Sequence, residues 1–268
     1  MTATRALLIG ASYRSHPELA LRGCANDVCG MAHALQGCDM AVLADGVPQE
    51  GWERLPASVR AAVRGPPSRA AILAEVDRLV AWAEAEPGAS YVWFYFSGHG
   101  GQVQDSGKEE LDGKDEYILA GDVQGITDDV LRQRLVEALP ARCTLMAIID
   151  ACHSGTMLDL KNRYRSGSPS PFRLRFLHPR IRASAYLLSS SRHNQTSVEV
   201  RERNRWGGAL TLALLPLLRQ RQAVPLPSCE VLLGGLTEQM RRRQQPQRPQ
   251  LRSTARLEGD TVVPLWPA

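Results

Sequence analysis

The stretch YVWFYFSGHGG, residues 91–101, is an unbroken apolar run that stops at a polar, glycine-rich turn. A second run of this kind, CTLMAIIDACHSG, residues 143–155, stops at Asp150 and Cys152. A strand with one solvated face alternates apolar and polar residues, so runs without alternation predict strands that are covered on both faces. The two stretches therefore favour an α/β fold around a mostly parallel sheet.

The rest of the chain alternates between predicted strands and predicted helices. Strand patterns lie at residues 5–10, 40–44, 116–120, 185–190 and near 251–257. Helix patterns lie at residues 26–37, 68–86, 128–139, 207–220 and 229–242. Asn26, Ser68 and Thr127 are predicted N-caps, and Gly37 is predicted to end the first helix. Strands joined by helices predict a sheet with helices on both faces.

Composition restricts the class of protein. The chain has 268 residues, a net charge of +4 and six cysteines without CxxC pairs. No apolar run approaches the roughly 18 residues that span a bilayer. The apolar run near the N-terminus is too short and too poorly flanked for a secretory signal. We therefore expect a cytoplasmic protein with reduced thiols and no membrane partner.

Two segments are strongly basic. Residues 161–182 carry seven Lys and Arg and no acid, and residues 241–256 are similarly one-sided. Nucleic-acid-binding segments usually carry a recognition motif, and none is visible in either segment. We interpret both segments as solvated or loop regions and expect no nucleic-acid partner.

The polar residues that follow the two apolar strands suggest chemistry. Ligand sites gather at the carboxyl ends of parallel strands, so His99 and Cys152 would face one crevice if the strands are neighbours. A thiol needs a nearby imidazole to become a nucleophile, and glycines around His99 let the backbone approach a substrate and donate to an oxyanion. His153 is a rival base, but side chains adjacent in sequence point apart. Each motif alone has another explanation. The glycines around His99 also fit an ordinary turn, and Cys152 also fits a buried, unreactive thiol.

The joint pattern is more specific, because Ser-Gly-His-Gly precedes Asp-Ala-Cys-His-Ser-Gly by about fifty residues. With DGKDEYILAGD and ITDDVL between them, the chain resembles the metacaspases, which are caspase-like cysteine peptidases. The resemblance is firm over residues 5–160, and LLSSSRHNQTSVEV with GGALTLALL resembles the family's smaller subunit. It implies a caspase-like three-layer sandwich with a large-subunit-like region (1–160), a basic linker (161–182) and a small-subunit-like region (183–268). Together these would form one domain in a type I-like order without a prodomain.

The resemblance also implies the reaction. His99 would be the base and Cys152 the nucleophile of an endopeptidase that cuts after Arg or Lys through an acyl-enzyme. A carboxylate-lined pocket selects a cationic side chain. The pocket residues implied are Cys24, Asp27, Ser97 and Asp150. For Asp27, a helix-dipole role is an equal alternative, whereas Asp150 at the end of an apolar strand costs desolvation unless something uses it.

The resemblance further implies calcium as an activator that is not itself catalytic. Ca²⁺ takes six to eight oxygen ligands, and the family's site maps onto Asp115, Asp128, Asp129 and Asp159. Without the resemblance, Asp128 and Asp129 would be read as charges at a helix start.

Several functional expectations stay open at this point. A peptidase that cuts after Arg or Lys could also cut its own basic linker, although the linker could equally be a plain solvated loop. We expect protein or peptide substrates and a monomer. The alternatives are an inactive caspase-like scaffold or binding module, and a related peptidase that cuts after Asn or Asp.

Overall fold

The computed structural model describes residues 2–46, 48, 52–104, 113–167, 172–173, 181–190, 199–202, 204–219, 226–245, 247–258 and 260–266. Its strands are β1 (Ala3–Gly10), β2 (Asp39–Ala44), β3 (Val63–Gly65), β4 (Ser90–Ser97), β5 (Gly100–Gln104), β6 (Lys114–Leu119), β7 (Gly125–Thr127), β8 (Cys143–Asp150), β9 (Asn162–Arg165), β10 (Phe172–Arg173), β11 (Ser184–Ser189), β12 (Glu199–Glu202), β13 (Arg205–Gly208) and β14 (Gln250–Ser253). Its helices are α1 (Cys24–Ala34), α2 (Ala57–Ala61), α3 (Arg69–Ala85), α4 (Asp128–Leu131), α5 (Ala209–Arg219) and α6 (Cys229–Arg242), with short helical turns η1 (Pro17–Leu19), η2 (Trp52–Arg54) and η3 (Arg132–Val136).

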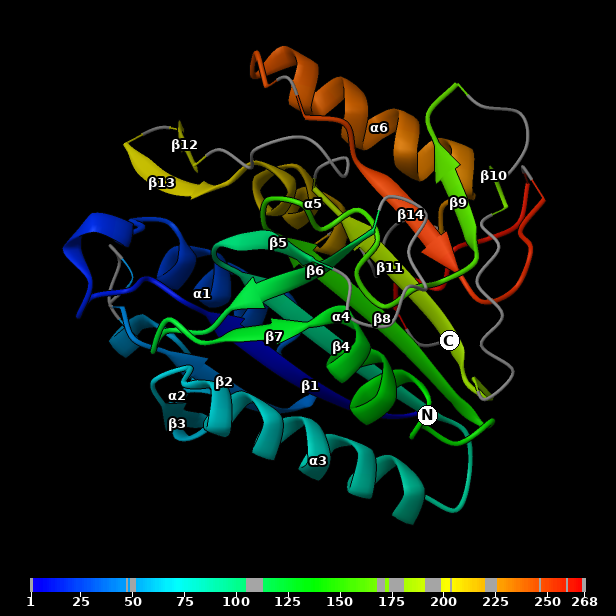
Figure 1. Ribbon diagram of the computed structural model, residues 1–268, viewed down its shortest axis with the longest axis horizontal. Coiled ribbons are helices and arrows are strands. Elements are labelled where there is room, and N and C mark those ends of the chain that lie inside the picture. The colour runs from blue at the N-terminus through cyan, green and yellow to red at the C-terminus, as the bar shows by residue number, and fades with distance from the viewer. Residues whose placement is uncertain are drawn as a thin grey trace.

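A nine-stranded sheet forms the centre of the fold, in the order β10-β9-β14-β11-β8-β4-β1-β2-β3. The strands from β11 to β3 pair in parallel, while β14, β9 and β10 add antiparallel pairs at the other end (Figure 1). The prediction of a mostly parallel sheet is confirmed. The two apolar strands, β4 and β8, are direct neighbours, and Ser97 lies opposite Asp150 in their register.

β4 shows why the apolar runs lack alternation. All eight of its residues are buried. Trp93 and Tyr95 belong to a core cluster shared with α1, α5 and α6, whereas Phe94 and Phe96 belong to a second cluster shared with α3 and η3. Each buried apolar side chain of this size contributes roughly 1.5–3 kcal/mol to folding. The sheet is therefore covered on both faces, which confirms the three-layer prediction (Figure 1).

Some predicted strands lie elsewhere than expected. Residues 116–120 were predicted to continue the central sheet, but β6 pairs antiparallel with β5 and β7 in a separate three-stranded sheet. The first residues of the predicted basic linker form β9, which pairs with β14 inside the central sheet. Linker residues 168–171 and 174–180 lie outside the described part of the chain.

The predicted helix caps are partly correct. Ser68 caps α3 by accepting from the Ala71 N–H at 3.2 Å. Thr127 occupies the N-cap of α4 without a side-chain bond, and the helix predicted for residues 128–139 changes into the π-helical turn η3. Asn26 does not cap, because α1 begins earlier, at Cys24, and Asn26 lies inside the helix.

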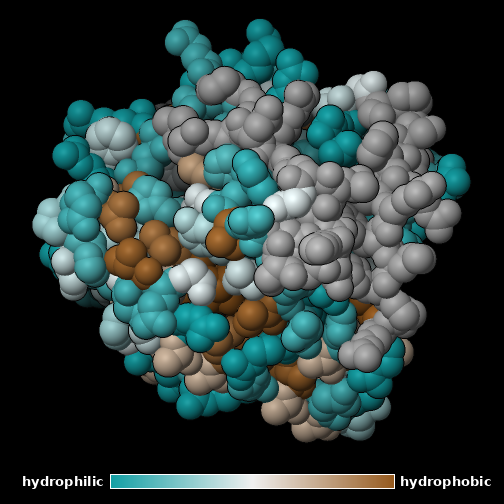
Figure 2. Space-filling view, in the orientation of Figure 1, coloured by the Kyte–Doolittle hydropathy of each residue, from teal (hydrophilic) through white to brown (hydrophobic). Residues whose placement is uncertain are grey.

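The surface is mixed in character. Figure 2 shows brown hydrophobic residues interrupted and surrounded by teal hydrophilic ones on the face it presents. Among the residues that the structure describes, no helix combines the length and apolar character that crossing a bilayer requires.

Candidate active site

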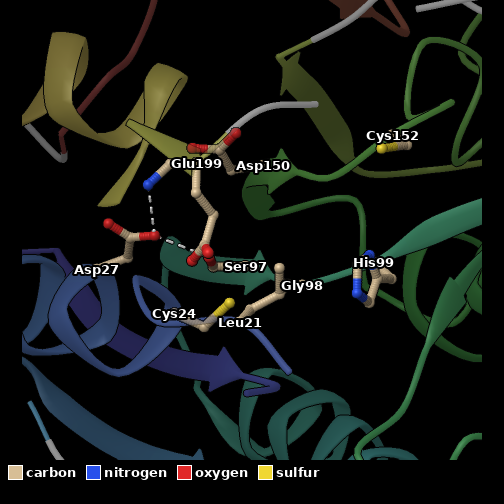
Figure 3. Close-up of a pocket in the computed structure, with 10 residues that line it drawn as sticks. Leu21, Cys24, Asp27, Ser97, Gly98, His99, Asp150, Cys152 and Glu199 are labelled. Atoms are coloured by element: carbon tan, nitrogen blue, oxygen red, sulfur yellow. Dashed lines mark hydrogen bonds between the residues drawn. The ribbon is translucent and has the colours of Figure 1, made fainter. Parts of the chain in front are cut away.

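A cavity of about 50 Å³ lies at the carboxyl ends of β4 and β8. Its lining consists of Leu21, Cys24, Asp27, Ser97, Gly98, His99, Asp150, Cys152, Glu199 and Gly208 (Figure 3). Every residue predicted for the dyad and the pocket is in this set. In the view of Figure 3, the acidic residues lie at one end of the cavity, and His99 and Cys152 lie at the other.

His99 stands in the tight turn between β4 and β5, and its ring is held from two sides. The Nε2 atom lies 2.9 Å from the Leu19 carbonyl oxygen. Because a carbonyl only accepts, Nε2 carries the proton in the neutral ring, and Nδ1 is the nitrogen left to accept one. The ring also packs on Tyr13, with 4.8 Å between the ring centroids.

Tyr13 fixes the backbone of the same turn. Its hydroxyl accepts from the His99 backbone N–H at 2.8 Å and donates to the Leu119 carbonyl at 2.7 Å. The Leu119 N–H in turn donates to the His99 carbonyl at 2.9 Å, which closes a ring of three hydrogen bonds. Burial raises the pKa of Tyr13, so its hydroxyl keeps the proton that it donates. Tyr13 itself adopts the left-handed region, at φ 54°.

Cys152 lies two residues beyond the end of β8 and lines the cavity. It is half-buried and not part of a disulfide, whereas the preceding Ala151 is buried. The rival base, His153, is not among the described residues that line the cavity, and its backbone is left-handed at φ 51°.

Asp27 belongs to the first turn of α1 and is buried, at 2% exposure. Its Oδ2 atom accepts from Ser97 Oγ at 2.9 Å and from the Gly208 N–H at 2.9 Å. Burial, followed by the charge of Asp150, raises the pKa of Asp27 well above its ordinary value. Its negative charge is therefore costly, and a nearby cation would relieve this cost.

Asp150 lies at 5% exposure where β8 meets the start of α5. Its Oδ2 atom accepts from the Thr211 N–H at 2.9 Å and from Thr211 Oγ1 at 2.8 Å. These bonds satisfy a donor in the first turn of α5 and place the carboxylate at the positive end of the helix. Burial nevertheless raises the pKa of Asp150.

Cys24 lies beside Asp27 in the pocket but is a poor nucleophile. Burial, followed by the charge of Asp27, raises the pKa of its thiol well above the ordinary value. The thiol therefore stays protonated, and Cys152 is the better candidate for covalent chemistry.

Three of the four acids predicted to bind calcium, Asp128, Asp129 and Asp159, lie in one region. Asp115, Asp128 and Asp159 are buried, and the Glu116 N–H donates to Asp128 Oδ2 at 3.1 Å. Burial and then the charges of Asp159 and Glu116 raise the pKa of Asp128 to about 9. Crowded carboxylates of this kind suit Ca²⁺ in donor chemistry. Nevertheless, within the described ranges, no cluster of three or more His, Cys, Asp or Glu side chains is arranged to hold a metal ion.

Arg132 supplies positive charge to two of these acids. Its Nε donates to Asp159 Oδ2 at 3.1 Å, and its other guanidinium nitrogens pair with Asp129 and Glu137. The Arg132 side chain is only 8% exposed. Two of the four predicted calcium ligands therefore already share a buried counter-ion, which sequence reasoning did not anticipate.

Comparison with known proteins decides the family. Residues 4–161 match the sequence model described as "Metacaspase, peptidase C14 domain". The chain belongs to the metacaspase family. It is 40% identical over 169 residues to Metacaspase-1 of Yarrowia lipolytica, and 36% identical over 169 residues to Metacaspase-1 of Schizosaccharomyces pombe. These matches cover 60% of this chain but only 33% and 36% of the two relatives, so this metacaspase-family chain matches about a third of their length.

Solved structures extend the likeness of this metacaspase to the whole fold. Protein GSU0716 of Geobacter sulfurreducens superposes with a TM-score of 0.59 at 21% identity, covering 97% of this chain and 99% of that one. Caspase-1 of Spodoptera frugiperda superposes with a TM-score of 0.51 at 11% identity, covering 95% of this chain and 86% of that one. At such identities, the likeness establishes the caspase-like fold alone.

Sequence reasoning missed several residues of this metacaspase site. Tyr13 had a usable signal, because it lies just beyond the carboxyl end of β1, at the same edge of the sheet as His99. Thr211 and Glu199 left no such signal, because only the packing of α5 brings Thr211 to Asp150, and only the packing of the β12–β13 hairpin brings Glu199 to the cavity.

Proposed function

We propose that the chain is a cysteine endopeptidase that cuts peptide bonds after Arg or Lys. One observation carries the proposal: a thiol and an imidazole share a single cavity with two buried carboxylates (Figure 3). The first pair supplies nucleophilic chemistry, and the second pair supplies a preference for a cationic side chain.

The proposed reaction uses His99 first as a base and then as an acid. Nδ1 of His99 takes the proton of Cys152, and the thiolate attacks the carbonyl carbon of the substrate. When the tetrahedral intermediate collapses, the C–N bond breaks and His99 gives the proton to the leaving amine. Water then attacks the thioester and loses a proton to His99, which releases the new carboxylate and restores the thiol. The Leu19 carbonyl keeps the ring in the required tautomer throughout.

The specificity follows from the charge of the pocket. Asp27 and Asp150 are buried, and the pKa values of both are raised, Asp27's in part by the charge of Asp150. A guanidinium or ammonium group between them removes that repulsion, whereas an Asp side chain would add a third negative charge. This argues against the alternative of cleavage after Asp or Asn.

Calcium is part of the proposal as an activator. Asp115, Asp128, Asp129 and Asp159 would hold the ion, and bound Ca²⁺ would neutralise their crowded charges and draw together the segments that carry them. Binding has a readout that does not depend on catalysis. In the inactive Cys152→Ala variant, Ca²⁺ should raise the thermal midpoint and Mg²⁺ should not, and the rise should vanish when Asp128 is also replaced by Asn. Equal midpoints with Ca²⁺ and with chelator would remove calcium from the proposal.

Self-cleavage in the basic linker is the most specific part of the proposal. Arg163 and Arg165 lie within β9 and are hydrogen-bonded into the sheet, so cutting there requires local unfolding. Lys161, just before this strand, and Arg182, at the end of the linker, are exposed and are the more accessible of the described sites. Mass spectrometry after incubation with calcium, beside the Cys152→Ala variant, will show whether a cut occurs and where.

A panel of fluorogenic peptides ending in Arg, Lys, Asp or Asn tests the activity itself. We expect cleavage after Arg and Lys, loss in Cys152→Ala, and retention in Cys38→Ala, which removes a partly exposed thiol outside the cavity. Activity that survives in Cys152→Ala would refute the mechanism. Correct folding without cleavage of any peptide would favour the alternative of an inactive scaffold.

A further inference from the structure

The cavity contains a third carboxylate that the dyad and the predicted pocket do not use. Glu199 begins β12 and lines the cavity together with Asp27 and Asp150. It is half-buried, whereas the other two acids are buried, so it lies nearer to solvent. Figure 3 shows its side chain extending from the strand toward the first turn of α1.

Backbone donors hold this carboxylate in place. Oε2 accepts from the Arg22 N–H at 3.1 Å, and Oε1 accepts from the Gly23 N–H. Gly23 is the N-cap of α1, the helix that carries Cys24 and Asp27. Two anchored oxygens fix the rotamer of Glu199, so the entropy cost of ordering a long side chain is met before substrate binds.

Glycines bring the hairpin close enough for this arrangement. In the β12–β13 register, Glu199 lies opposite Gly208, whose N–H donates to Asp27. A Cβ at Gly207 would lie 2.7 Å from Asp27 Oδ1, and one at Gly208 would overlap Asp150 Oδ2. The hairpin backbone therefore approaches both buried acids and delivers the third acid beside them.

The three acids have no basic partner in the cavity. Neither Lys nor Arg occurs among the described residues that line it. The guanidinium of Arg22, the neighbouring basic residue, lies instead over the Trp206 ring, 5.3 Å from its centroid. The charge of Glu199 also raises the pKa of Asp27, although less than burial and the charge of Asp150 do. The Glu199 and Asp27 carboxylates therefore repel each other.

We propose that Glu199 is a specificity-determining residue, the outer of three carboxylates that bind the cationic side chain before the scissile bond. This inference rests on the proposed peptidase function. A guanidinium has five N–H donors, more than two carboxylates saturate, and Glu199 provides further acceptors where the side chain enters. The competing role for Glu199 is purely structural, as an anchor for the segment before α1.

Arginine and its neutral isostere citrulline distinguish these roles. Two fluorogenic peptides that differ only in Arg or citrulline before the scissile bond have nearly the same shape but differ in charge. Because both are cut by the same variant, a loss of folded enzyme cancels in the ratio of their kcat/KM values. Glu199→Gln removes the negative charge that faces the guanidinium, so this variant should lower the Arg-to-citrulline ratio about tenfold, mainly through a higher KM for the Arg peptide.

Two further variants complete the test. Glu199→Asp keeps the charge and should retain most of the ratio, even if its shorter side chain weakens the anchor. Glu202→Gln removes a carboxylate from the same strand, where it pairs with Arg243 at 3.3 Å, and should leave the ratio unchanged.

The outcomes separate the inference from the function on which it rests. If the unaltered protein prefers Arg but Glu199→Gln keeps the full ratio, or lowers cleavage of both peptides equally, Glu199 is only an anchor and the inference is overturned. If the unaltered protein does not cut the Arg peptide, or if Cys152→Ala cuts it as well, both the function and the inference fail.

Discussion

Replacing Tyr13 by Phe isolates one hydroxyl that holds the turn carrying His99. The hydroxyl accepts from the His99 N–H at 2.8 Å and donates to the Leu119 carbonyl at 2.7 Å, while the aromatic ring packs on His99. The Phe side chain keeps the ring and its packing and removes only the oxygen. Any effect therefore comes from the two hydrogen bonds and not from a cavity.

The size of the effect follows from the burial of the hydroxyl. Tyr13 is fully buried, so water does not readily replace the oxygen. Losing the hydrogen bonds and leaving buried partners unpaired costs about 1–3 kcal/mol for each group, offset in part by no longer burying a hydroxyl. We expect the free energy of unfolding to fall by about 2 kcal/mol, which lowers the thermal midpoint by roughly 4–8 °C. Catalysis should lose about tenfold in kcat with little change in KM, because the turn that carries His99 is less firmly placed.

Tyr91→Phe is the matched control for this experiment. Tyr91 is also buried, and its hydroxyl donates to the Pro264 carbonyl, but the residue lies at the opposite end of β4 from His99. This variant should lose stability, measured by thermal unfolding, and should keep its kcat. If Tyr13→Phe unfolds at the same temperature as the unaltered protein and retains its kcat, Tyr13 does not position the dyad.

Three other predictions follow from charges in the structure. Asp27→Asn should raise the thermal midpoint at neutral pH and raise the KM for Arg peptides at least tenfold, because the variant removes a buried negative charge that costs stability but would pair with a cationic substrate. The folded-state pKa of Asp27 is raised above its ordinary value of 3.8. The contribution of Asp27 to stability is therefore present at low pH and declines as the pH rises from that value through the raised pKa. The increase in thermal midpoint caused by Asp27→Asn should accordingly be larger at pH 8 than at pH 4. The raised pKa values of Asp27 and Asp150 also mean that KM should rise as the pH falls for the Arg peptide, whereas a flat KM would contradict a charged pocket. Arg132→Leu should destabilise the fold by about 3–5 kcal/mol, because it leaves Asp129 and Asp159 without their counter-ion, and Ca²⁺ should raise the thermal midpoint of this variant more than that of the unaltered protein.

The central sheet was predictable because burial on both faces leaves a direct trace in the sequence. A strand such as β4 reads as a continuous apolar run when each of its faces packs on a helix layer. β5 and β9 leave no such trace. β5 is partly exposed and rich in Gly and Gln, and β9 lies in a basic segment whose Arg, Ser and Pro residues suggest a loop. Both are strands because neighbouring strands provide hydrogen-bond partners, which a pattern along one segment does not reveal.

Some residues of the site were likewise predictable from the sequence, and others were not. His99 and Cys152 follow predicted strands, and the rule that ligand sites gather at the carboxyl ends of parallel strands is enough to bring them together. Their placement on one cavity confirms this expectation. Glu199 and Arg132 could not be found in this way, because their roles depend on where a hairpin and a helical turn pack in three dimensions.

The pocket is built from two parts of the chain, of which the family model matches only the first. The family match ends at residue 161, yet Asp150 accepts from Thr211, Asp27 accepts from the Gly208 N–H, and the half-buried Glu199 lines the same cavity. The first of these bonds also holds the N-terminal turn of α5, so the carboxylate at the end of β8 stabilises the C-terminal region as well as lining the pocket. The proposed dyad therefore belongs to the part of the chain that matches the family model, whereas the shape and charge of the pocket are completed by Glu199, Gly208 and Thr211. It follows that substitutions in this later segment should change the choice of substrate with little effect on the intrinsic reactivity of Cys152, which alkylation rates of the thiol can measure independently of any peptide.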